Sequence, residues 1–129
     1  MRFPQLIVYE TDGRLARILE ATAGTHRWAL RQPRRVESCL QLLRQAEPAL
    51  VVVKVENDLE SAFTLVERTA WLFPGVAVVV VLDRDEAMLC ELAWDLGAAF
   101  VVAPPQPRER LLDVVASLMG EEPNGNESA

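Results

Sequence analysis

The amino-acid sequence predicts an α/β fold in which one parallel sheet is covered by helices on both faces. Valine-rich runs lie at residues 6–9, 49–55, 76–82 and 100–103. These runs do not alternate with polar residues, which is typical of strands buried on both faces of a parallel sheet. Segments with helical spacing separate them, and strands that alternate with helices favour right-handed crossovers within one open sheet.

Chain length and composition agree with this fold class. The 129 residues are 50% apolar and 25% charged, which indicates a globular protein long enough to bury the core of one domain. We therefore expect a single domain over residues 1–120. The acidic segment 121–129, EEPNGNESA, has little apolar content and is expected to be a disordered tail.

Each helix is predicted from apolar residues that recur at intervals of three and four positions. Gly24 is expected to end the first helix, Asp58 to cap the start of the third, and Pro74-Gly75 to end the third. The five apolar sets are Leu15, Ile18, Leu19 and Thr22; Val36, Cys39, Leu40 and Leu43; Leu59, Ala62, Phe63, Val66 and Ala70; Leu89, Leu92 and Leu96; and Leu111, Val115 and Leu118.

One more strand is required between the first two helices, and the segment HRWALRQ at 26–32 supplies it. Its alternation places His26, Trp28 and Leu30 on one face and polar residues on the other. A one-sided pattern of this kind predicts an edge strand. We therefore interpret His26 as a surface or rim residue rather than a metal ligand.

The charge and the cysteines exclude several functions. Residues 1–45 contain eight arginines and four acids, whereas residues 46–129 contain five basic groups and fifteen acids, for a net charge of −6. An acidic chain has no general electrostatic reason to bind nucleic acid. Without a membrane-length apolar run or a signal-peptide cleavage site, a cytoplasmic location with no membrane partner is expected. Cys39 and Cys90 are far apart and no CxxC occurs, so neither a zinc site nor a disulfide framework is expected, and Cys39 is expected to be a buried thiol.

The carboxyl ends of the predicted strands are where ligands and catalytic groups gather in such a fold. Those ends hold Lys54, the pairs Tyr9-Glu10 and Leu82-Asp83, and Pro104-Pro105. Lys54 is the only lysine, and the other twelve basic residues are arginine. Because a buried ammonium needs an opposite charge, we expect Lys54 to form an internal salt bridge with Glu10 or Asp83.

Four segments resemble the response-regulator receiver domain, the CheY-like phosphoacceptor module of two-component signalling. They are LIVYETDGRL, PALVVVKV, FPGVAVVVVLDRDE and LGAAFVVAPP, and the resemblance covers residues 4–119. It implies a (βα)₅ flavodoxin-like three-layer sandwich whose five parallel strands are ordered 2-1-3-4-5. Receivers often hold the peptide bond before the proline at position 105 in the cis form, so a cis bond is expected there.

The resemblance in layout does not extend to the chemistry. Tyr9 and Glu10 match the two metal-binding acids, so one acid is retained. Lys54 matches the phosphoacceptor aspartate, Leu82 the hydroxyl residue and Pro104 the lysine that pairs with the phosphoryl group. Phosphorylation requires a carboxylate nucleophile and a bound Mg²⁺. We therefore predict no catalytic residue, no useful Mg²⁺ binding, no cofactor and no phosphoryl transfer to this chain.

The resemblance also implies a contact face for a protein partner or a homodimer, formed by the fourth helix, the fifth strand and the fifth helix. Helical angles place Leu89, Leu92, Ala93 and Leu96 toward the core, with Trp94 almost opposite them. Two interpretations of Trp94 are open: it covers a neighbouring helix or loop and extends the core, or it is exposed within a charged rim, which is typical of an interface. We favour the second. The predicted surface residues are Ala87, Cys90, Glu91, Trp94, Asp95, Phe100 and Val101.

Two other features of the sequence concern the surface. Arg14 and Arg17 share one side of the first helix, and Arg34-Arg35 start the second, which gives a basic patch opposite in sign to the acidic fourth helix. That polarity allows head-to-tail association. Trp71, near the end of the third helix, is expected to pack against Pro74.

These observations leave three hypotheses. The first is a pseudo-receiver that acts without phosphorylation and without enzymatic activity, as a protein-protein interaction module. The second is a flavodoxin-like domain that binds a small molecule or nucleotide at the strand ends, although TDGRL lacks a glycine-rich phosphate loop. The third is a receiver phosphorylated at an unconventional residue such as Thr11 or Ser61. A nucleophilic role for Lys54 is disfavoured because no companion acid–base set is evident.

Overall fold

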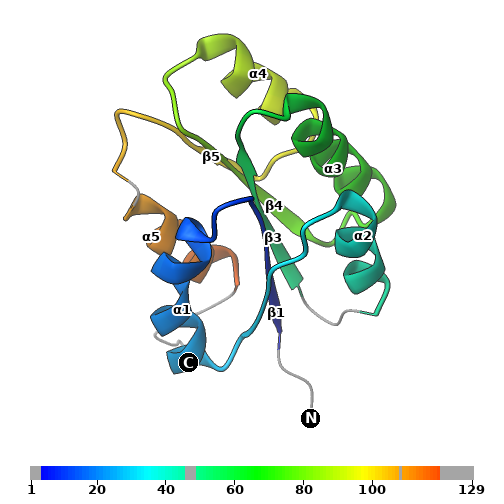
Figure 1. Ribbon diagram of the computed structural model, residues 1–129, viewed down its shortest axis with the longest axis vertical. Helices are drawn as coiled ribbons and strands as arrows, with labels where there is room; N and C mark the ends of the chain where they lie inside the picture. Colours follow the sequence, from blue (N-terminus) through cyan, green and yellow to red (C-terminus); the bar gives the residue numbers. More distant parts are fainter. Residues whose placement is uncertain (1–3, 46–48, 108, 120–129) are drawn as a thin grey trace, which may run out of the picture.

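Five strands alternate with five helices in the computed structural model, which describes residues 4–45, 49–107 and 109–119 (Figure 1). The elements in chain order are β1 Gln5–Tyr9, α1 Arg14–His26, β2 Ala29–Arg31, α2 Val36–Gln45, β3 Ala49–Val55, α3 Leu59–Leu72, β4 Ala77–Leu82, α4 Ala87–Asp95, β5 Phe100–Val102 and α5 Arg110–Leu118. No helix within this described part is long and apolar enough to cross a membrane. The predicted disordered tail 121–129 lies outside the described residues.

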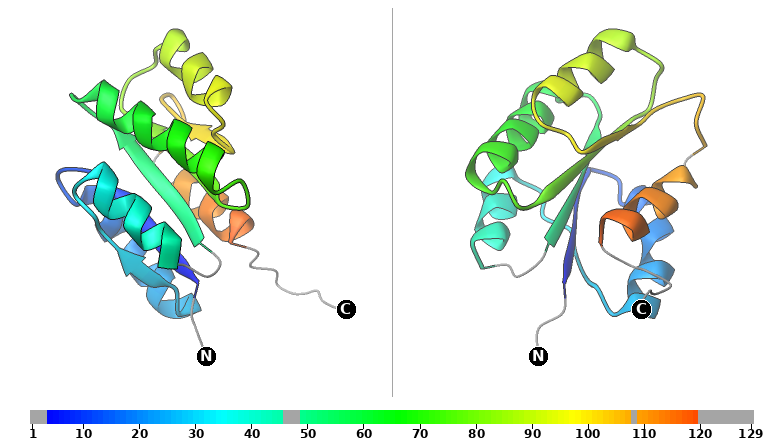
Figure 2. Two further views of the ribbon diagram at one scale, coloured as in Figure 1. Left: turned by 90° about the vertical axis from the view of Figure 1, so that its right-hand side faces the viewer. Right: turned by 180° about the vertical axis from the view of Figure 1, so that it is seen from behind.

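The strands form one parallel sheet in the order β2-β1-β3-β4-β5, which confirms the predicted topology. β1 lies between β2 and β3, and β4 pairs with β3 on one side and β5 on the other. The two edges of the sheet are therefore β2 and β5, as the one-sided pattern of the segment 26–32 predicted for β2. Figure 2 shows the sheet between its two helical layers.

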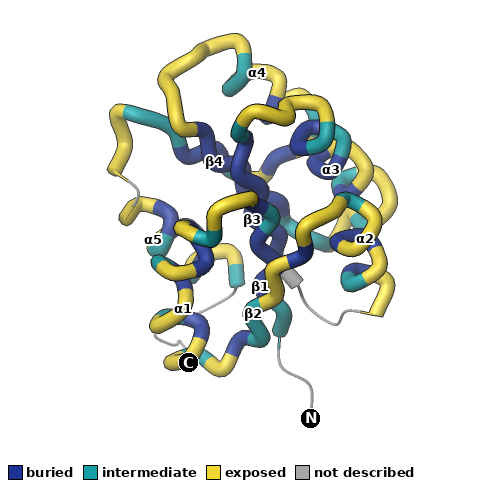
Figure 3. The backbone as a smooth tube through the Cα atoms, viewed as in Figure 1, coloured by how far each residue is buried: buried dark blue, intermediate teal, exposed yellow. Residues whose placement is uncertain are grey.

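Successive side chains of the central strands enter two different cores because strand residues alternate between faces. Val51 and Val53 pack under α2, α3 and α4, whereas Leu50 and Val52 pack under α1 and α5. These valine and leucine side chains are almost completely buried, as the dark centre of Figure 3 shows. Burial on both faces explains why the strand sequences are continuously apolar.

The first helix extends beyond its predicted end. α1 continues through Gly24 to His26 and ends where Arg27 adopts a left-handed conformation with φ 61°. The backbone N–H of Trp28 then donates to the carbonyl of Ala23 at 2.9 Å. The strand consequently starts at Ala29 rather than at His26. His26 is half-buried, as expected of a rim residue, and it stacks on the buried Trp28 ring at 4.6 Å.

The fourth helix is rotated relative to the predicted orientation. Leu89, Ala93 and Leu96 pack against the core as predicted. Cys90 also packs there, whereas Leu92 is 40% exposed, so the expectations for these two residues were wrong. The helix is apolar over most of its circumference, and its sequence therefore defines the inward direction poorly.

The turn after α4 approaches α3 closely at Gly97. Its φ is +112°, and a Cβ at this position would lie 2.5 Å from the Cβ of Ala70. Because glycine alone adopts this conformation easily and leaves the necessary space, Gly97 fixes the C-terminal end of α4 against α3.

Several other local predictions have clear outcomes. Asp58 caps α3 as predicted, since its carboxylate accepts hydrogen bonds from the Ser61 N–H at 3.0 Å and the Ser61 hydroxyl at 2.7 Å. The peptide bond between Pro104 and Pro105 is cis, also as expected.

Cys39 is a buried thiol, as predicted, and burial raises its pKa to about 12. Trp71 is 83% exposed, so the prediction that it packs against Pro74 was wrong.

Candidate functional site

Lys54 lies near the carboxyl end of β3, with its side chain on the side of the sheet covered by α1 and α5. Its neighbours Val53 and Val55 pack under α2, α3 and α4, and alternation along the strand directs Lys54 to the opposite face. The side chain is only 6% exposed, so its ammonium group has lost most of its contact with water. A buried ammonium of this kind requires acidic partners within the protein.

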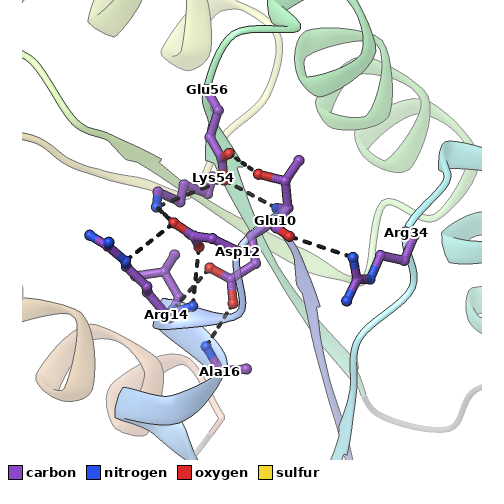
Figure 4. Close-up of polar contacts among 9 residues, drawn as sticks. Glu10, Asp12, Arg14, Ala16, Arg34, Lys54 and Glu56 are labelled. Atoms are coloured by element: carbon purple, nitrogen blue, oxygen red, sulfur yellow. Dashed lines mark hydrogen bonds and ion pairs between the residues drawn. The ribbon is translucent and has the colours of Figure 1, made fainter.

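Those partners are Asp12 and Glu56. The Lys54 Nζ lies 3.2 Å from Asp12 Oδ2, 3.4 Å from Asp12 Oδ1 and 3.8 Å from Glu56 Oε2 (Figure 4). The prediction of an internal salt bridge is therefore confirmed, but the predicted partners, Glu10 and Asp83, were wrong. Asp83 is exposed, and its carboxylate lies 3.9 Å from the Arg84 Nε.

Glu10 has a different function, which is to complete the start of α1. Its Oε1 accepts the N–H of Leu15 and its Oε2 the N–H of Ala16, each at 2.9 Å. The residue at the N-cap, Gly13, has no side chain to accept these hydrogen bonds. Glu10 supplies the missing acceptor from within the β1–α1 loop and is only 7% exposed. Both of its oxygens are thereby oriented toward the helix.

A second set of contacts joins the loop after β1 to the loop after β3. The Thr11 N–H donates to Glu56 Oε2 at 3.2 Å, and the Thr11 hydroxyl donates to Glu56 Oε1. The Arg34 guanidinium lies 3.5 Å from the Thr11 carbonyl, and the Arg14 Nε lies 3.6 Å from Asp12 (Figure 4). The hydrogen bonds from Thr11 to Glu56 and the Lys54 ion pairs therefore connect the two loops.

Two ionisable groups at this end of the sheet, Asp12 and Tyr9, have shifted pKa values. The pKa of Asp12 is lowered, mainly because its carboxylate accepts the Arg14 N–H and also because it pairs with Lys54. The pKa of Tyr9 is raised, chiefly by burial of its phenol. Tyr9 packs against the core under α2, α3 and α4, so its ring is on the opposite side of the sheet from Lys54. Asp12 is thus an anion, and Tyr9 a neutral phenol, at neutral pH.

Three carboxylates gather here, although the sequence predicted only one. Oxygen atoms of Glu10, Asp12 and Glu56 lie within 4.8 Å of one another, a spacing compatible with a cation. However, Glu10 already accepts two amides, and the Lys54 ammonium contacts the other two carboxylates. These contacts fit a tethered ammonium and do not fit Mg²⁺, which the lysine would repel.

The other strand-end residues are not part of this network. Leu82 is buried in the core under α2, α3 and α4, on the face away from Lys54, and Pro104-Pro105 follow β5. A cavity of about 240 Å³ opens beside the network. Its lining is formed by Tyr9, Glu10, Thr11, Arg34, Lys54, Glu56, Asn57 and Asp58.

Sequence reasoning missed Asp12 and Glu56 because both lie just beyond the strands. Asp12 is in the TDG turn, and Glu56 is two residues after Lys54. Helical and strand periodicity says nothing about side-chain directions in such loops. The available signal was local charge, since a buried lysine between two acidic loops will pair with the carboxylate that reaches it.

The predicted partner surface is partly assembled on α4 and β5. Ala87, Glu91, Trp94 and Asp95 are exposed, whereas Cys90 is half-buried against the core. The Trp94 ring contacts the half-buried Phe100 edge to face, with 6.0 Å between centroids. Val101 is only 8% exposed and contributes little to the surface.

The fifth helix adds two residues that sequence reasoning did not select. The Arg110 guanidinium lies over the Phe100 ring, 5.3 Å from its centroid. Arg110 and Asp113 are part of the wall of a cavity of about 180 Å³ between β5 and α5. Trp94, Phe100 and Arg110 thus form a continuous row from α4 across β5 to α5, and we call this row with its surroundings the α4–β5–α5 face.

Solved structures of receiver domains share this fold over nearly the whole chain. The CheY-like response regulator receiver domain protein from Methanospirillum hungatei JF-1 is 12% identical, with 93% of this chain and 96% of that chain covered and a TM-score of 0.76. A response regulator from Thermotoga maritima is 19% identical, with coverages of 94% and 100% and a TM-score of 0.75. The signal receiver domain of an HD domain-containing protein from Pseudomonas fluorescens Pf-5 is 19% identical, with coverages of 93% and 89% and a TM-score of 0.77.

Comparisons with protein-family profiles and with curated proteins found no match. The chain therefore has the flavodoxin-like fold of CheY-like receiver domains, and at these identities the likeness establishes the fold alone.

Proposed function

We propose that this protein is a pseudo-receiver: a non-enzymatic, phosphorylation-independent interaction module in signal transduction. The observation that carries the proposal is the position of the Lys54 ammonium, 3.2 Å from Asp12, where the resemblance to receivers implies a phosphoacceptor carboxylate. The fold of receiver domains supports the assignment to signalling, and the altered chemistry of the pocket supports independence from phosphate.

The chemistry of Lys54 is incompatible with the receiver reaction. Phosphoryl transfer to a side chain needs a nucleophile with a free electron pair and a metal ion that offsets the developing negative charge. A protonated amine has no free pair, and its positive charge opposes a divalent cation at the same carboxylates. Lys54 instead supplies a positive charge to Asp12 and Glu56 from within the chain. The loops that a phosphoryl group would rearrange are already connected.

The surface proposed to carry the function is the α4–β5–α5 face. Trp94 is 48% exposed although it is a large apolar side chain, and it is next to the exposed acids Glu91 and Asp95. Partly exposed aromatic residues within a polar rim are the usual centres of protein interfaces. A protein partner or a second copy of the chain that binds here would bury Trp94 with Phe100.

Intact mass spectrometry after incubation with acetyl phosphate and Mg²⁺ tests the independence from phosphorylation. We expect no gain of about 80 Da, the mass of one phosphoryl group. A receiver with an aspartate at the end of its third strand, treated in parallel, shows that the reagents are active. A stable adduct on this chain, at Lys54, Thr11, Ser61 or elsewhere, would contradict the proposal.

The alternative hypothesis, a small molecule bound at the strand ends, receives less support from the structure. The cavity beside Lys54 measures about 240 Å³ and is lined largely by charged and polar residues. Typical ligand pockets occupy about 300–1,000 Å³ and are mostly apolar. A thermal-shift screen with nucleotides and flavins distinguishes the two, because a ligand bound to the folded state raises its melting temperature. We expect no such rise.

A further inference from the structure

The two edges of the sheet have opposite charges. Beside β5, the segment 83–95 contains α4 and exposes five acids and one arginine; the acids are Asp83, Asp85, Glu86, Glu91 and Asp95, and the arginine is Arg84. Around the carboxyl end of β2, at the other edge, four arginines are exposed together with the two acids Glu20 and Glu37; the arginines are Arg17, Arg31, Arg34 and Arg35. We call these regions the acidic edge and the basic edge. Figure 3 shows α4 and β2 at opposite ends of the molecule.

The basic edge is compact although its arginines come from three segments. Arg17 of α1 lines the same cavity as Gln32, which directly follows Arg31, and the acids Asp12 and Glu20 also line this cavity. Arg34 and Arg35 continue the chain from that point toward α2, and Arg34 reaches the Thr11 carbonyl. The four arginines therefore come from segments that meet near the carboxyl end of β2.

The distance between the edges prevents them from neutralising each other. Four spacings of about 4.8 Å separate β2 from β5, which makes roughly 19 Å across the sheet. The Debye length at physiological ionic strength is about 8 Å. Each edge therefore presents its own charge to the surroundings. The charge of the molecule is negative at the β5 edge of the sheet and positive at the β2 edge.

The acidic edge has the chemistry of a site for guanidinium groups. The indole of Trp94 is half exposed and can take a cation over its face, while Glu91 and Asp95 are placed nearby on the same helix. Arginine suits such a site better than lysine because its planar group both stacks on aromatic rings and pairs with carboxylates. Arg110 over Phe100 already shows this stacking within the same face.

We propose that the acidic edge binds the basic edge of a second copy of this chain, in a head-to-tail arrangement. The occupant is identified by charge complementarity: the arginine surface that the site requires is present on the same molecule. Two acidic edges facing each other would instead place like charges together, which disfavours a symmetric dimer through α4. The inference rests on the proposed role of the α4–β5–α5 face as a contact surface.

A head-to-tail contact leaves one edge free at each end of the assembly. It is a heterologous interface, which continues as an open chain unless the rotation between copies closes a ring. The average mass should therefore keep rising with protein concentration instead of stopping at a dimer. High salt should reduce it, because the Debye length falls to about 3 Å at 1 M ionic strength.

Sedimentation equilibrium of the full chain tests the proposal with two matched double variants. Glu91→Ala with Trp94→Ala alters the acidic edge, and Arg17→Ala with Arg31→Ala alters the basic edge. We expect the wild-type mass to rise above 14.4 kDa with concentration at low salt and each double variant to stay near that monomer mass. An equimolar mixture of the two variants retains one intact contact and should reach about twice the monomer mass. Circular dichroism confirms that each variant is folded.

Three results would overturn the inference. One is a wild-type chain that stays monomeric up to about 1 mM, the weak end of specific association. Another is a mass that stops at the dimer and survives the arginine substitutions, which indicates a symmetric contact. The third is a mixture in which the two double variants stay monomeric while the wild type associates. If the wild type is monomeric but captures another protein through Trp94, the proposed function stands and this inference alone fails. If the chain associates as expected but accepts phosphate, the proposed function alone fails.

Discussion

The end of β3 and the outer face of α4 differ in whether their side chains have partners within the chain. At the end of β3, the charged groups find partners within the chain: Lys54 pairs with Asp12 and Glu56, and Glu10 accepts two amides of α1. On α4, Met88 is 80% exposed and Trp94 48%. A closed polar network needs nothing from outside, whereas an apolar surface gains free energy when a partner covers it. This contrast supports the proposal that α4 contacts a partner.

Among the substitutions that test this comparison, Gly97→Ala is expected to lower the free energy of unfolding most. The new Cβ would lie 2.5 Å from the Cβ of Ala70. The alanine would also have to adopt a φ of +112°, which is unfavourable for a residue with a side chain. Strain and overpacking together should lower the free energy of unfolding by about 2–5 kcal/mol. Urea denaturation measures the loss.

Gly24→Ala is the matched control for Gly97→Ala. Gly24 lies inside α1 with no atom within 4 Å of an added Cβ. Because alanine favours the helix over glycine, we expect a gain of about 0.5–1 kcal/mol. Equal effects at the two glycines would contradict the view that Gly97 fixes α4 against α3.

The second largest loss of stability is expected for a substitution of Lys54, in the pocket at the end of β3. Lys54→Met keeps an apolar stem of similar length but removes the ammonium that contacts Asp12 and Glu56, while Asp12 keeps its contact with Arg14. We expect a loss of about 1–2 kcal/mol, less than the about 3–5 kcal/mol typical of a fully buried pair. The reason is that the Asp12 and Glu56 side chains keep 39% and 18% exposure to water. Denaturation midpoints measure the change.

Arg84→Met is the matched control for Lys54→Met. Arg84 also has two carboxylates near it, Asp83 at 3.9 Å and Glu86 at 3.8 Å, but its side chain is 59% exposed. Exposed pairs contribute between about 0 and 1 kcal/mol, so the control should change little. A gain in stability for Lys54→Met would show that its ion pairs do not hold the pocket together.

Lowering the pH is expected to have a smaller effect on the free energy of unfolding. The pKa of Asp12 in the folded protein is below its ordinary value of 3.8, so its carboxylate stabilises the fold above that pH. This contribution is lost as pH falls through the lowered pKa. Because part of it comes from Lys54, the difference in stability between wild type and Lys54→Met should narrow as pH falls from about 6 to about 3. A constant difference would indicate that Asp12 does not depend on Lys54.

The smallest effect on stability is expected at the α4 surface. Trp94→Ala removes an edge-to-face contact with Phe100 but leaves the buried face of the helix intact. We expect a change of about 1 kcal/mol or less in the free energy of unfolding. Capture of a partner should fall much further, because interface aromatics often contribute about 2 kcal/mol or more to binding. Unchanged capture would place the interface elsewhere.

The fold was predictable from the sequence because its strands are buried on both faces. Continuous runs such as ALVVVKV predict strands buried on both faces of a parallel sheet, whereas the strand order 2-1-3-4-5 was implied by the resemblance to receiver domains. The end of α1 was less predictable, since Arg27 rather than Gly24 adopts the left-handed conformation. A glycine permits that conformation without requiring it.

The site was less predictable than the fold. The need of Lys54 for a counter-ion followed from its burial, but the identity of that ion depended on the loops. Glu10 was excluded because α1 starts with a glycine cap and takes both of its oxygens. On α4, apolar residues surround most of the helix, so packing against the core decided between Cys90 and Leu92.

The central claim is that the pocket around Lys54 no longer switches the α4 surface. Amide resonances of the ¹⁵N-labelled full chain, recorded before and after addition of Mg²⁺ and acetyl phosphate, test it most directly. We expect the signals from 10–14, 54–58 and α4 to stay at the same positions, apart from small uniform salt effects. Coupled shifts in the pocket and in α4 would contradict it, because they would show a working phosphorylation switch.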